Sequence, residues 1–471
     1  MLHYSQTRRT FWERAYSQAS RRRRLAWGYQ HILQRRYAAL VPKGQRVLEL
    51  GCGSGNLLAA LQPGFGVGVD LSAAALHSAR TQHPHLHWVQ ADAQALPFDG
   101  PFDVIILSDL VNDLWDVQLL LERLQKLCHR RTRIILNTYS RLWQLPLGIA
   151  ELLGLKRRTL PQNWFTLEDL KNLLRLTDYE AVTSTAEILL PLEIPLVSGL
   201  LNGFLAKLPF FNIFALTNFL IARPLRGHMT VAPSVSLVIP ARNEAGNIPA
   251  IFARVPQLAG DVEFIFVEGH SKDDTYQVIQ REMQQHPEIK STLLKQTGVG
   301  KANAVWQGFA AATNDILVIL DSDLSVPPED LSRFYEAIAS GKGEFINGTR
   351  LVYPMEARAM QTANIVGNKA FSLIFSWLLG QPVKDTLCGT KVLLRHDFEL
   401  LKQEYALFNK VDPFGDFDLL LGAATLNLKI VDLPVRYRER TYGQTNIQRW
   451  RHGLMLARIT LAALLTYKFI P

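Results

Sequence analysis

Short apolar runs, each ended by a glycine-rich or acidic loop, recur along the first half of the chain. They lie at 47–50, 67–70, 87–90, 104–107 and 134–136. The spacing leaves room for a helix between most successive runs, which predicts an α/β domain with a parallel, doubly wound sheet. Helical periodicity over 168–176 follows, with Thr166 as its N-cap, and the runs 181–190 and 213–222 predict two more strands.

A second series of apolar runs starts beyond residue 233, at 236–240, 264–267 and 316–320. The segment between the two series is rich in proline, glycine and charge, as is typical of a domain boundary. We therefore expect a first domain over 1–226, a linker over 227–233, a second domain over 234–450 and an amphipathic tail over 451–471. With 471 residues, the chain is long enough for two hydrophobic cores.

The composition favours anionic partners. The net charge is +9, while 48% of the residues are apolar and 20% are charged. Nucleotides and phospholipid head groups fit this charge, whereas nucleic acid is excluded as a partner because no nucleic-acid-binding motif is present. The cysteines are Cys52, Cys128 and Cys388, which are too far apart in the sequence to indicate a disulfide framework or a metal site. The chain starts without the apolar core of a signal peptide. We therefore expect a cytoplasmic protein.

Three further segments bear on membranes. The first 40 residues are basic and aromatic, which suits a solvated helical lead-in, a lid over an active site, or an anionic-surface contact. The segments 191–212 and 453–471 are apolar but interrupted by proline or basic residues, so neither is predicted to span a membrane. Burial in a core is the alternative for both, and we expect instead peripheral attachment to the cytoplasmic face of a membrane.

A glycine loop, Glu49-Leu50-Gly51-Cys52-Gly53-Ser54-Gly55, follows the first predicted strand. Glycines at this place let the backbone approach a ligand closely. Acids end the next two strands, namely Asp70 before Leu71 and Asp92 before Ala93. An acid about 20 residues after such a loop can bind ribose hydroxyls.

This set resembles class I S-adenosylmethionine (SAM)-dependent methyltransferases over about residues 30–225. The resemblance implies SAM as the cofactor, with the loop on its methionyl part, Asp70 on the ribose and Asp92 on the adenine amine. A nicotinamide-dinucleotide domain is the alternative, but the loop lacks its Gly-x-Gly-x-x-Gly spacing. Asp109, after the fourth strand, could orient or deprotonate a methyl acceptor, or it could cap a helix.

The second domain carries Asp321 and Asp323 directly after an apolar strand. Two carboxylates at i and i+2 supply hard oxygen ligands for Mg²⁺ or Mn²⁺ at the edge of a sheet, and a solvated turn is the alternative. Three other motifs precede this pair, at 238–244, 266–275 and 300–304. The ordered set resembles the family 2 glycosyltransferases of the GT-A fold, closest in style to polyprenyl-phosphate sugar transferases, over about residues 233–450.

That resemblance implies an acceptor-side loop at 384–391 and roles for other residues. Nucleotide-sugar contacts fall on Pro240, Asn243, Glu244, Glu268 and Lys301, with Lys301 alternatively an exposed helix lysine. Asp416 or Asp418 would be the general base for a hydroxyl acceptor, whereas a lipid phosphate needs no base. Arg438 and Arg440 would neutralise the leaving diphosphate.

The expected fold is thus two Rossmann-like α/β domains in tandem. The expected protein is bifunctional: it transfers sugar from a nucleotide sugar to a polyprenyl-phosphate or glycan acceptor, and methyl from SAM to an unidentified acceptor. Two alternatives stay open. One is a glycosyltransferase whose methyltransferase domain is inactive or binds SAM as a regulator, and the other is a membrane scaffold without activity.

Overall fold

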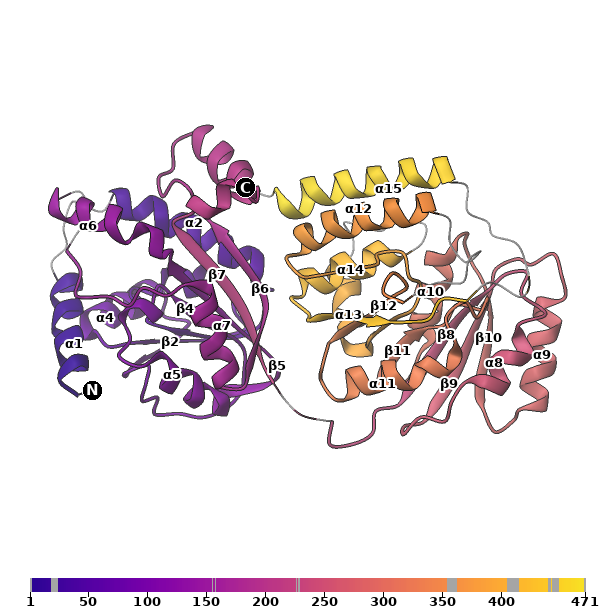
Figure 1. Ribbon diagram of the computed structural model, residues 1–471. Helices are drawn as coiled ribbons and strands as arrows, with labels where there is room; N and C mark the ends of the chain where they lie inside the picture. The colour runs from indigo at the N-terminus through magenta and orange to yellow at the C-terminus, as the bar shows by residue number, and fades with distance from the viewer. Residues whose placement is uncertain are drawn as a thin grey trace. The chain divides into compact units, whose positions relative to one another are not determined.

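The computed structural model describes residues 2–17, 24–154, 156, 158–225, 227, 229–353, 362–404, 415–438, 442 and 449–469. The chain divides into two compact units (Figure 1). The first comprises Met1–Arg226 with Phe469–Pro471, and the second comprises Gly227–Lys468. Among the described helices, none combines the length and the hydropathy that a membrane span requires.

The first unit is built on a seven-stranded sheet of described residues in the order β3-β2-β1-β4-β5-β7-β6. Its strands are β1 (Arg46–Leu50), β2 (Phe65–Asp70), β3 (His87–Gln90), β4 (Phe102–Ser108), β5 (Cys128–Tyr139), β6 (Tyr179–Glu187) and β7 (Thr217–Pro224). β7 runs antiparallel to both β5 and β6, so the expectation of an all-parallel sheet is wrong at this edge.

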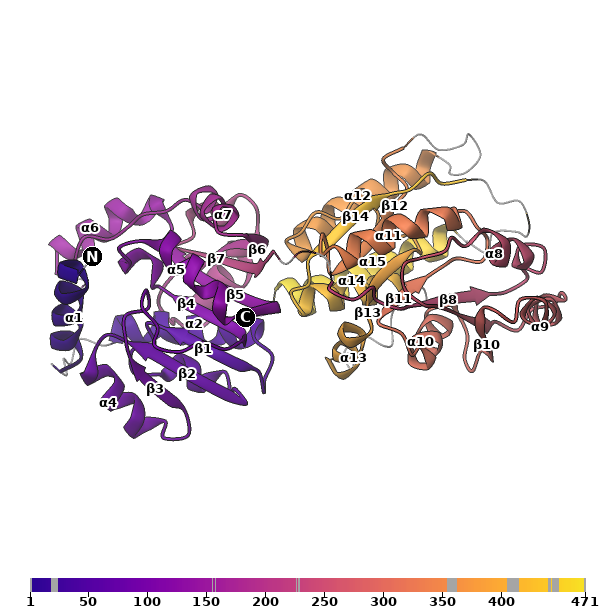
Figure 2. The same cartoon turned by 90° about the horizontal axis from the view of Figure 1, so that it is seen from below.

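Alternate residues of each central strand pack on opposite faces of this sheet, because side chains in a strand have a period of two. Ile105 and Leu107 join a core with α5 (Val117–Leu124) and α7 (Leu167–Leu176). Val104 and Ile106 join a core with α2 (Arg24–Leu40), α3 (Asn56–Ala60) and α4 (Ala73–Gln82). Figure 2 shows the two groups of helices on either side of the sheet. The N-cap at Thr166 is confirmed, with a full capping box to Asp169.

The second unit also has a seven-stranded sheet of described residues, in the order β10-β9-β8-β11-β13-β12-β14. Its strands are β8 (Val235–Ala241), β9 (Val262–Glu268), β10 (Lys290–Lys295), β11 (Ile316–Ile319), β12 (Phe345–Thr349), β13 (Lys391–Leu394) and β14 (Ile430–Pro434). β13 runs antiparallel to β11 and β12, so this sheet is mixed as well.

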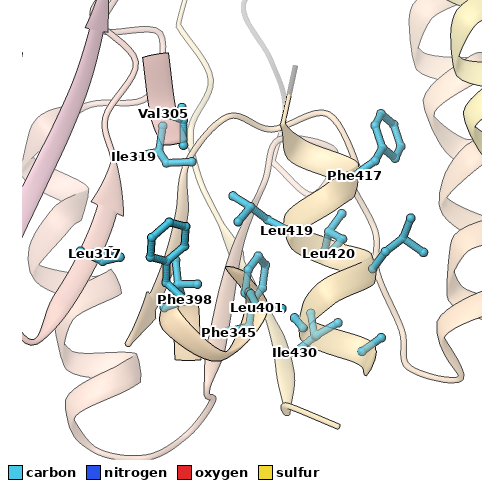
Figure 3. Packing of buried hydrophobic residues seen from close by; sticks show 14 of the residues in the cluster. Val305, Leu317, Ile319, Phe345, Phe398, Leu401, Phe417, Leu419, Leu420 and Ile430 are labelled. Atoms are coloured by element: carbon cyan, nitrogen blue, oxygen red, sulfur yellow. The ribbon is translucent and has the colours of Figure 1, made fainter. Parts of the chain in front are cut away.

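Helices cover both faces of the second sheet. On one face lie α8 (Ile248–Arg254), α9 (Thr275–Gln285) and α11 (Leu331–Ala339). On the other lie α10 (Lys301–Ala311), α12 (Thr362–Leu379), α13 (Arg395–Glu404), α14 (Asp416–Thr425) and α15 (Arg449–Ala463). Figure 3 shows the centre of this second core, where Leu419 of α14 lies near Leu401 of α13. The ring of Phe417, at the start of α14, packs instead on Phe375 of α12, with ring centroids 5.0 Å apart.

A further sequence expectation needs correction. The run 213–222 does not form one strand: Phe211–Phe214 is a 3₁₀ turn, and β7 begins at Thr217. A short apolar run cannot by itself distinguish a strand from a tight helical turn. The C-terminal segment, expected as an amphipathic tail with burial in a core as the alternative, forms α15, whose Leu456, Ile459 and Ala463 are buried in the core of the second unit.

Candidate functional site

The glycine loop of the first unit turns sharply at the carboxyl end of β1. Gly51, Gly53 and Gly55 have φ of +74°, +54° and +75°, a region that side chains other than glycine rarely adopt. A Cβ on Gly55 would overlap the indole of Trp88, so this loop also has no room for a larger residue. The backbone N–H of Gly53 donates to Asp70 Oδ2 at 2.8 Å, which links the loop to the end of β2.

Two acids next to this loop each accept hydrogen bonds from backbone N–H groups. Asp70 also accepts from the backbone N–H of Ser72 at 2.9 Å, and its pKa is raised by burial against the opposing effect of these hydrogen bonds. Glu49 is 2% exposed and accepts from the N–H of Leu58 at 3.0 Å. Burial raises the pKa of Glu49 to about 8, so this carboxyl group is largely neutral at pH 7. Its bond to Leu58 holds the short helix α3 in place.

The remaining predicted cofactor residues lie at the adjacent strand ends. Asp92, after β3, accepts from the N–H of Gln94 at 2.9 Å. Ala93 is buried in the core, and the carbonyl of Leu71 accepts from the side chain of Gln90 at 3.1 Å. The structure therefore brings the loop, Asp70 and Asp92 to one edge of the sheet, as parallel neighbouring strands require.

Helix α1 (Leu2–Ser17) lies across this edge, which the sequence pattern did not establish. Ser5 Oγ donates to Asp92 at 2.6 Å, and Glu13 accepts from Ser72 Oγ at 2.8 Å. A Cβ on Gly53 would overlap the hydroxyl of Tyr16. These contacts favour the lid among the interpretations of this segment, and Phe11, Trp12 and Tyr16 between its basic residues are half-buried.

Asp109 directly follows β4, with φ of +51°, and is half-buried. It accepts from the hydroxyl of Tyr29 at 3.0 Å and from Asn137 Nδ2 at 2.5 Å, two partners that the sequence did not reveal. Burial raises the pKa of Asp109 to about 7. It does not cap the following 3₁₀ helix, whose N-cap is Leu110 without a side-chain bond, so the cap alternative is wrong.

In the second unit, Asp321 follows β11 and lies 2.5 Å from Lys301 Nζ, at the start of α10. Burial alone would lower the pKa of Lys301, but the carboxylates of Asp321, Asp416 and Asp323 raise it well above its usual range. Lys301 is therefore a permanently charged member of an acidic cluster and not an exposed helix lysine. Asp323 accepts from the N–H and the hydroxyl of Ser325 at 3.0 and 2.7 Å, which holds its carboxylate in place.

Asp416 and Asp418 both lie in the first turn of α14, but their side chains have different neighbours. Asp416 is 3.8 Å from Lys391 Nζ, a fully buried lysine that the sequence pattern did not single out. Residues at i and i+2 of a helix do not face the same side, so Asp418 points away from this cluster. Burial raises the pKa of Asp418 to about 7.

Gly389 lies where these groups meet. A Cβ at this position would overlap the carboxylate of Asp321 and the ammonium of Lys301, so only glycine fits. The carbonyl of its neighbour Cys388 accepts from Lys391 Nζ at 2.7 Å. The acceptor-side loop predicted around residues 384–391 therefore packs directly against Lys301 and Asp321, the groups at the carboxyl end of β11.

Loops after β8 and β9 hold the other predicted nucleotide contacts. Ser322 Oγ donates to the carbonyl of Pro240 at 2.8 Å, joining the ends of β11 and β8. Two bonds join these loops: the N–H of Asn243 donates to Ser271 Oγ at 3.0 Å, and the N–H of Glu244 donates to Thr275 Oγ1 at 2.9 Å. Within the β9 loop, the N–H of Ser271 donates to Glu268 Oε1 at 2.5 Å. Glu268 thus positions the β9 loop.

Of the two predicted arginines, Arg438 is exposed, and its N–H donates to the carbonyl of Ser325 at 2.9 Å. That bond places its backbone beside the loop of Asp323. Arg440 lies outside the described residues.

The donor atoms fit the implied groups. Carboxylate oxygens are hard ligands that suit Mg²⁺ or Mn²⁺, and Asp321 and Asp323 are the residues that would supply them. Within the part of the chain that the structure describes, no group of three or more His, Cys, Asp or Glu side chains is arranged to hold a metal ion. In the first unit, the positive-φ glycines and the acids beyond them fit a nucleoside ligand such as SAM.

A buried ion pair supports the acceptor-side loop. Arg350 binds Asp385 through two parallel bonds, Nε–Oδ2 at 2.7 Å and Nη2–Oδ1 at 2.9 Å, and Asp385 is 0% exposed. Although burial alone would raise the pKa of Asp385, Arg350 lowers it.

We expect Asp385→Ala to reduce the free energy of unfolding by about 3–5 kcal/mol, because it leaves the buried guanidinium without its counter-charge. Urea unfolding of the full chain, followed by its tryptophan fluorescence, would measure this. The control is Glu329→Ala, which breaks the surface pair with Arg254 at 2.8 Å and should cost no more than about 1 kcal/mol. Equal losses in the two variants would contradict the prediction.

Comparisons with known proteins agree with two different domains. Residues 18–184 match the family model of a methyltransferase domain, and residues 236–399 match that of glycosyl transferase family 2. The chain is 25% identical over 217 residues to an undecaprenyl-phosphate 4-deoxy-4-formamido-L-arabinose transferase of Photorhabdus laumondii, covering 45% of the chain and 62% of the relative. It is 26% identical over 225 residues to a dolichol-phosphate mannosyltransferase of Pyrococcus furiosus, covering 45% of the chain and 59% of the relative.

The chain thus spans about three fifths of the length of these curated relatives. Among solved structures, a mannosyltransferase of Pyrobaculum calidifontis in complex with GDP-Man and Mn²⁺ is 21% identical and has a TM-score of 0.37. That similarity covers 51% of the chain and 66% of the mannosyltransferase.

Proposed function

We propose that this chain, which joins a methyltransferase domain to a family 2 glycosyltransferase domain, transfers a sugar from a nucleotide diphosphate to a polyprenyl phosphate and methyl from SAM to a second acceptor. The observation that carries the first activity is the cluster of Lys301, Asp321 and Asp416 beside Gly389, inside the second unit and at the carboxyl edge of its sheet. The lipid-phosphate acceptor is proposed from the relatives, whose names specify undecaprenyl and dolichol phosphate.

In this proposal, Asp321 and Asp323 hold Mg²⁺ or Mn²⁺. A bound divalent ion would offset charge on the departing diphosphate. Lys301 keeps Asp321 in a fixed position and adds a permanent positive charge. Arg438 is placed near the same loop and would contribute further positive charge. Pro240, Asn243, Glu244 and Glu268 would shape the pocket for the base and ribose.

The acceptor determines whether a base is required. A polyprenyl phosphate is already an anion and can attack without losing a proton. A glycan hydroxyl would need a base, and Asp416 is then the better candidate of the two acids, because it faces Lys391 and Lys301. Attachment to the cytoplasmic face of a membrane belongs to the proposal, since a polyprenyl chain stays in the bilayer.

For methyl transfer, the glycine loop, Asp70 and Asp92 would hold SAM, with Glu49 holding the start of α3, the helix that follows the loop. Asp109, held by Tyr29 and Asn137, would orient the acceptor or take its proton. A carboxyl whose pKa is about 7 can accept or keep a proton near neutral pH, which suits either role.

A thermal-shift screen tests both activities on one protein. We expect a nucleotide sugar with Mn²⁺ to raise Tm by several degrees, and SAM to add a further, independent rise, because each ligand binds only the folded state. Excess EDTA should remove the first rise and leave the second. No rise with any of the common nucleotide sugars and Mn²⁺ would refute the sugar-transfer proposal, and no rise with SAM would refute the methyl-transfer proposal.

A further inference from the structure

Two surface segments of the first unit are strongly apolar and yet exposed. One is α6 (Gln144–Leu152) with its flanking residues, and no residue of this helix is buried. The other is the segment 194–214, in which the helical turns Gly199–Phe204 and Phe211–Phe214 also bury no residue. The exposed fraction reaches 78% at Leu145, 92% at Leu196 and 68% at Phe210. A protein surface rarely leaves so many large apolar side chains uncovered without a partner.

The two segments form one surface, which we call the apolar face. The indole Nε1–H of Trp143 donates to the carbonyl of Phe214 at 3.0 Å, and the N–H of Ser140 donates to the carbonyl of Leu216 at 2.7 Å. Both segments thus leave the sheet at one place, after β5 and before β7. Figure 1 shows them on the same upper side of the first unit. Its large exposed side chains are Leu142, Leu145, Ile149, Leu152, Leu153, Ile194, Leu196, Val197, Leu200, Phe204, Phe210, Phe211, Ile213 and Phe214.

The charges beside the apolar face point to a lipid bilayer as its occupant. The sequence 141–160 contains Arg141, Lys156, Arg157 and Arg158 but only one acid, Glu151. Arg141 and Arg158 are exposed at the two ends of the α6 segment. An apolar surface with aromatic side chains and a cationic border matches an anionic membrane, where the apolar groups enter the head-group region and the cations meet phosphates.

The apolar face begins close to Asp109, the residue that the sequence links to the methyl acceptor. The hydroxyl of Tyr29, which donates to Asp109, is also 3.3 Å from the hydroxyl of Thr217, the first residue of β7. The ring of Tyr29 lies 6.0 Å from that of Tyr139, the last residue of β5. Asp109 is therefore one side chain away from the points at which both apolar segments leave the sheet.

We propose that the apolar face docks on an anionic bilayer and that the methyl acceptor is a molecule held in that bilayer. This rests on the proposed methyl transfer and specifies the class of its acceptor. The methyl carbon passes from the sulfonium of SAM to an oxygen or nitrogen of the lipid-borne acceptor, leaving S-adenosylhomocysteine, and the displaced proton goes to Asp109 or to solvent.

Vesicle flotation with the full chain tests the docking. We expect binding to vesicles of phosphatidylcholine with about 30% phosphatidylglycerol, and weaker binding to phosphatidylcholine alone. The variants Leu145→Glu/Ile149→Glu and Phe210→Glu/Phe214→Glu should each lower the partition coefficient at least about tenfold, because each removes two apolar groups from the bilayer and adds two charges. Leu176→Glu, 60% exposed on α7 of the same unit, is the matched control and should bind like wild type.

Light scattering and SAM titration distinguish docking on a bilayer from self-association of the chain. Unchanged flotation of both double variants would overturn the docking. So would a wild-type dimer that the variants convert to monomers, because the apolar face would then be an interface between two copies. SAM affinity should stay unchanged in all variants, and if wild type does not bind SAM, the proposed methyl transfer fails independently of the flotation result.

The acceptor class has its own readout. Wild type incubated with tritiated SAM and vesicles of a total lipid extract from the organism that carries this chain should place label in the organic phase. The amount of label in the organic phase should fall at least about tenfold in both double variants and stay at the wild-type amount in Leu176→Glu. Label confined to the aqueous phase would overturn the lipid-borne acceptor.

Discussion

Asp323→Ala is expected to lower the rate of sugar transfer about a thousandfold without unfolding the second unit. Asp323 is 8% exposed, two residues from Asp321, and in the proposed site it supplies one of the two carboxylates that the protein offers to Mg²⁺ or Mn²⁺. A catalytic metal contributes several kcal/mol of transition-state stabilisation, and about 1.4 kcal/mol corresponds to a factor of ten. The loss should appear as slower formation of polyprenyl-phosphate sugar from a labelled nucleotide sugar.

Two further variants make this result specific. Asp323→Asn keeps an oxygen that can accept from Ser325 but lacks the charge, so it should be as inactive as alanine while melting at the wild-type temperature. Asp330→Asn, which alters the surface pair with Arg333 at 3.3 Å, should retain full activity. If Asp323→Ala turned over at the wild-type rate, Asp321 and Asp323 would not form the metal site.

The second large effect is expected at Asp70. Asp70→Ala should weaken SAM binding about a hundredfold, measured by titration calorimetry on the full chain. The substitution removes the proposed ribose acceptor and also releases the N–H of Gly53, which Asp70 holds at 2.8 Å. A hydrogen bond to a charged group is worth about 1.5–3 kcal/mol, so the loss of these two effects accounts for this factor.

Asp99→Ala is the matched control, since Asp99 is an exposed carboxylate of the same unit. It should bind SAM like wild type. Equal affinity of wild type and Asp70→Ala would remove the assigned SAM pocket.

The same titration also separates the two hypotheses for the first unit. If SAM binds and no methyl transfer is found with any lipid or glycan acceptor, the methyltransferase domain acts as a binding or regulatory module. Methyl transfer that is lost in Asp109→Asn with unchanged SAM affinity would support a bifunctional enzyme. Burial raises the pKa of Asp109 to about 7, so a contribution of its ionised form should increase as the pH rises through that value.

Local motifs were predictable because their chemistry is contained in a few adjacent residues. Gly51, Gly53 and Gly55 have the positive φ angles that such a loop requires, and Asp321 and Asp323 follow a buried strand. Thr166 caps its helix through a bond to the residue three positions later. In each case the interaction lies within one turn or one strand end, so spacing in the sequence translates into position in space.

Contacts between distant segments were not predictable in the same way. The bonds of Ser5 to Asp92 and of Tyr29 to Asp109 join residues that are 87 and 80 positions apart. Lys391, the first residue of β13, is a fully buried lysine near Asp416, and the sequence around it does not show that its ammonium meets a carboxylate from α14. Nothing in the local pattern indicates which of two acids on one helix, Asp416 or Asp418, meets such a partner.

The sequence by itself determined two α/β domains, a glycine loop with its acids, and a pair of carboxylates after a strand. Only the tertiary structure decided that β7 and β13 run antiparallel, that α1 closes over the first site, and that the C-terminal helix belongs to the second core. The physical reason is the range of the interactions. Turn geometry and strand patterning act between neighbours, whereas strand direction, helix docking and the pairing of buried charges are set by burial of surfaces that come together only when the whole unit folds.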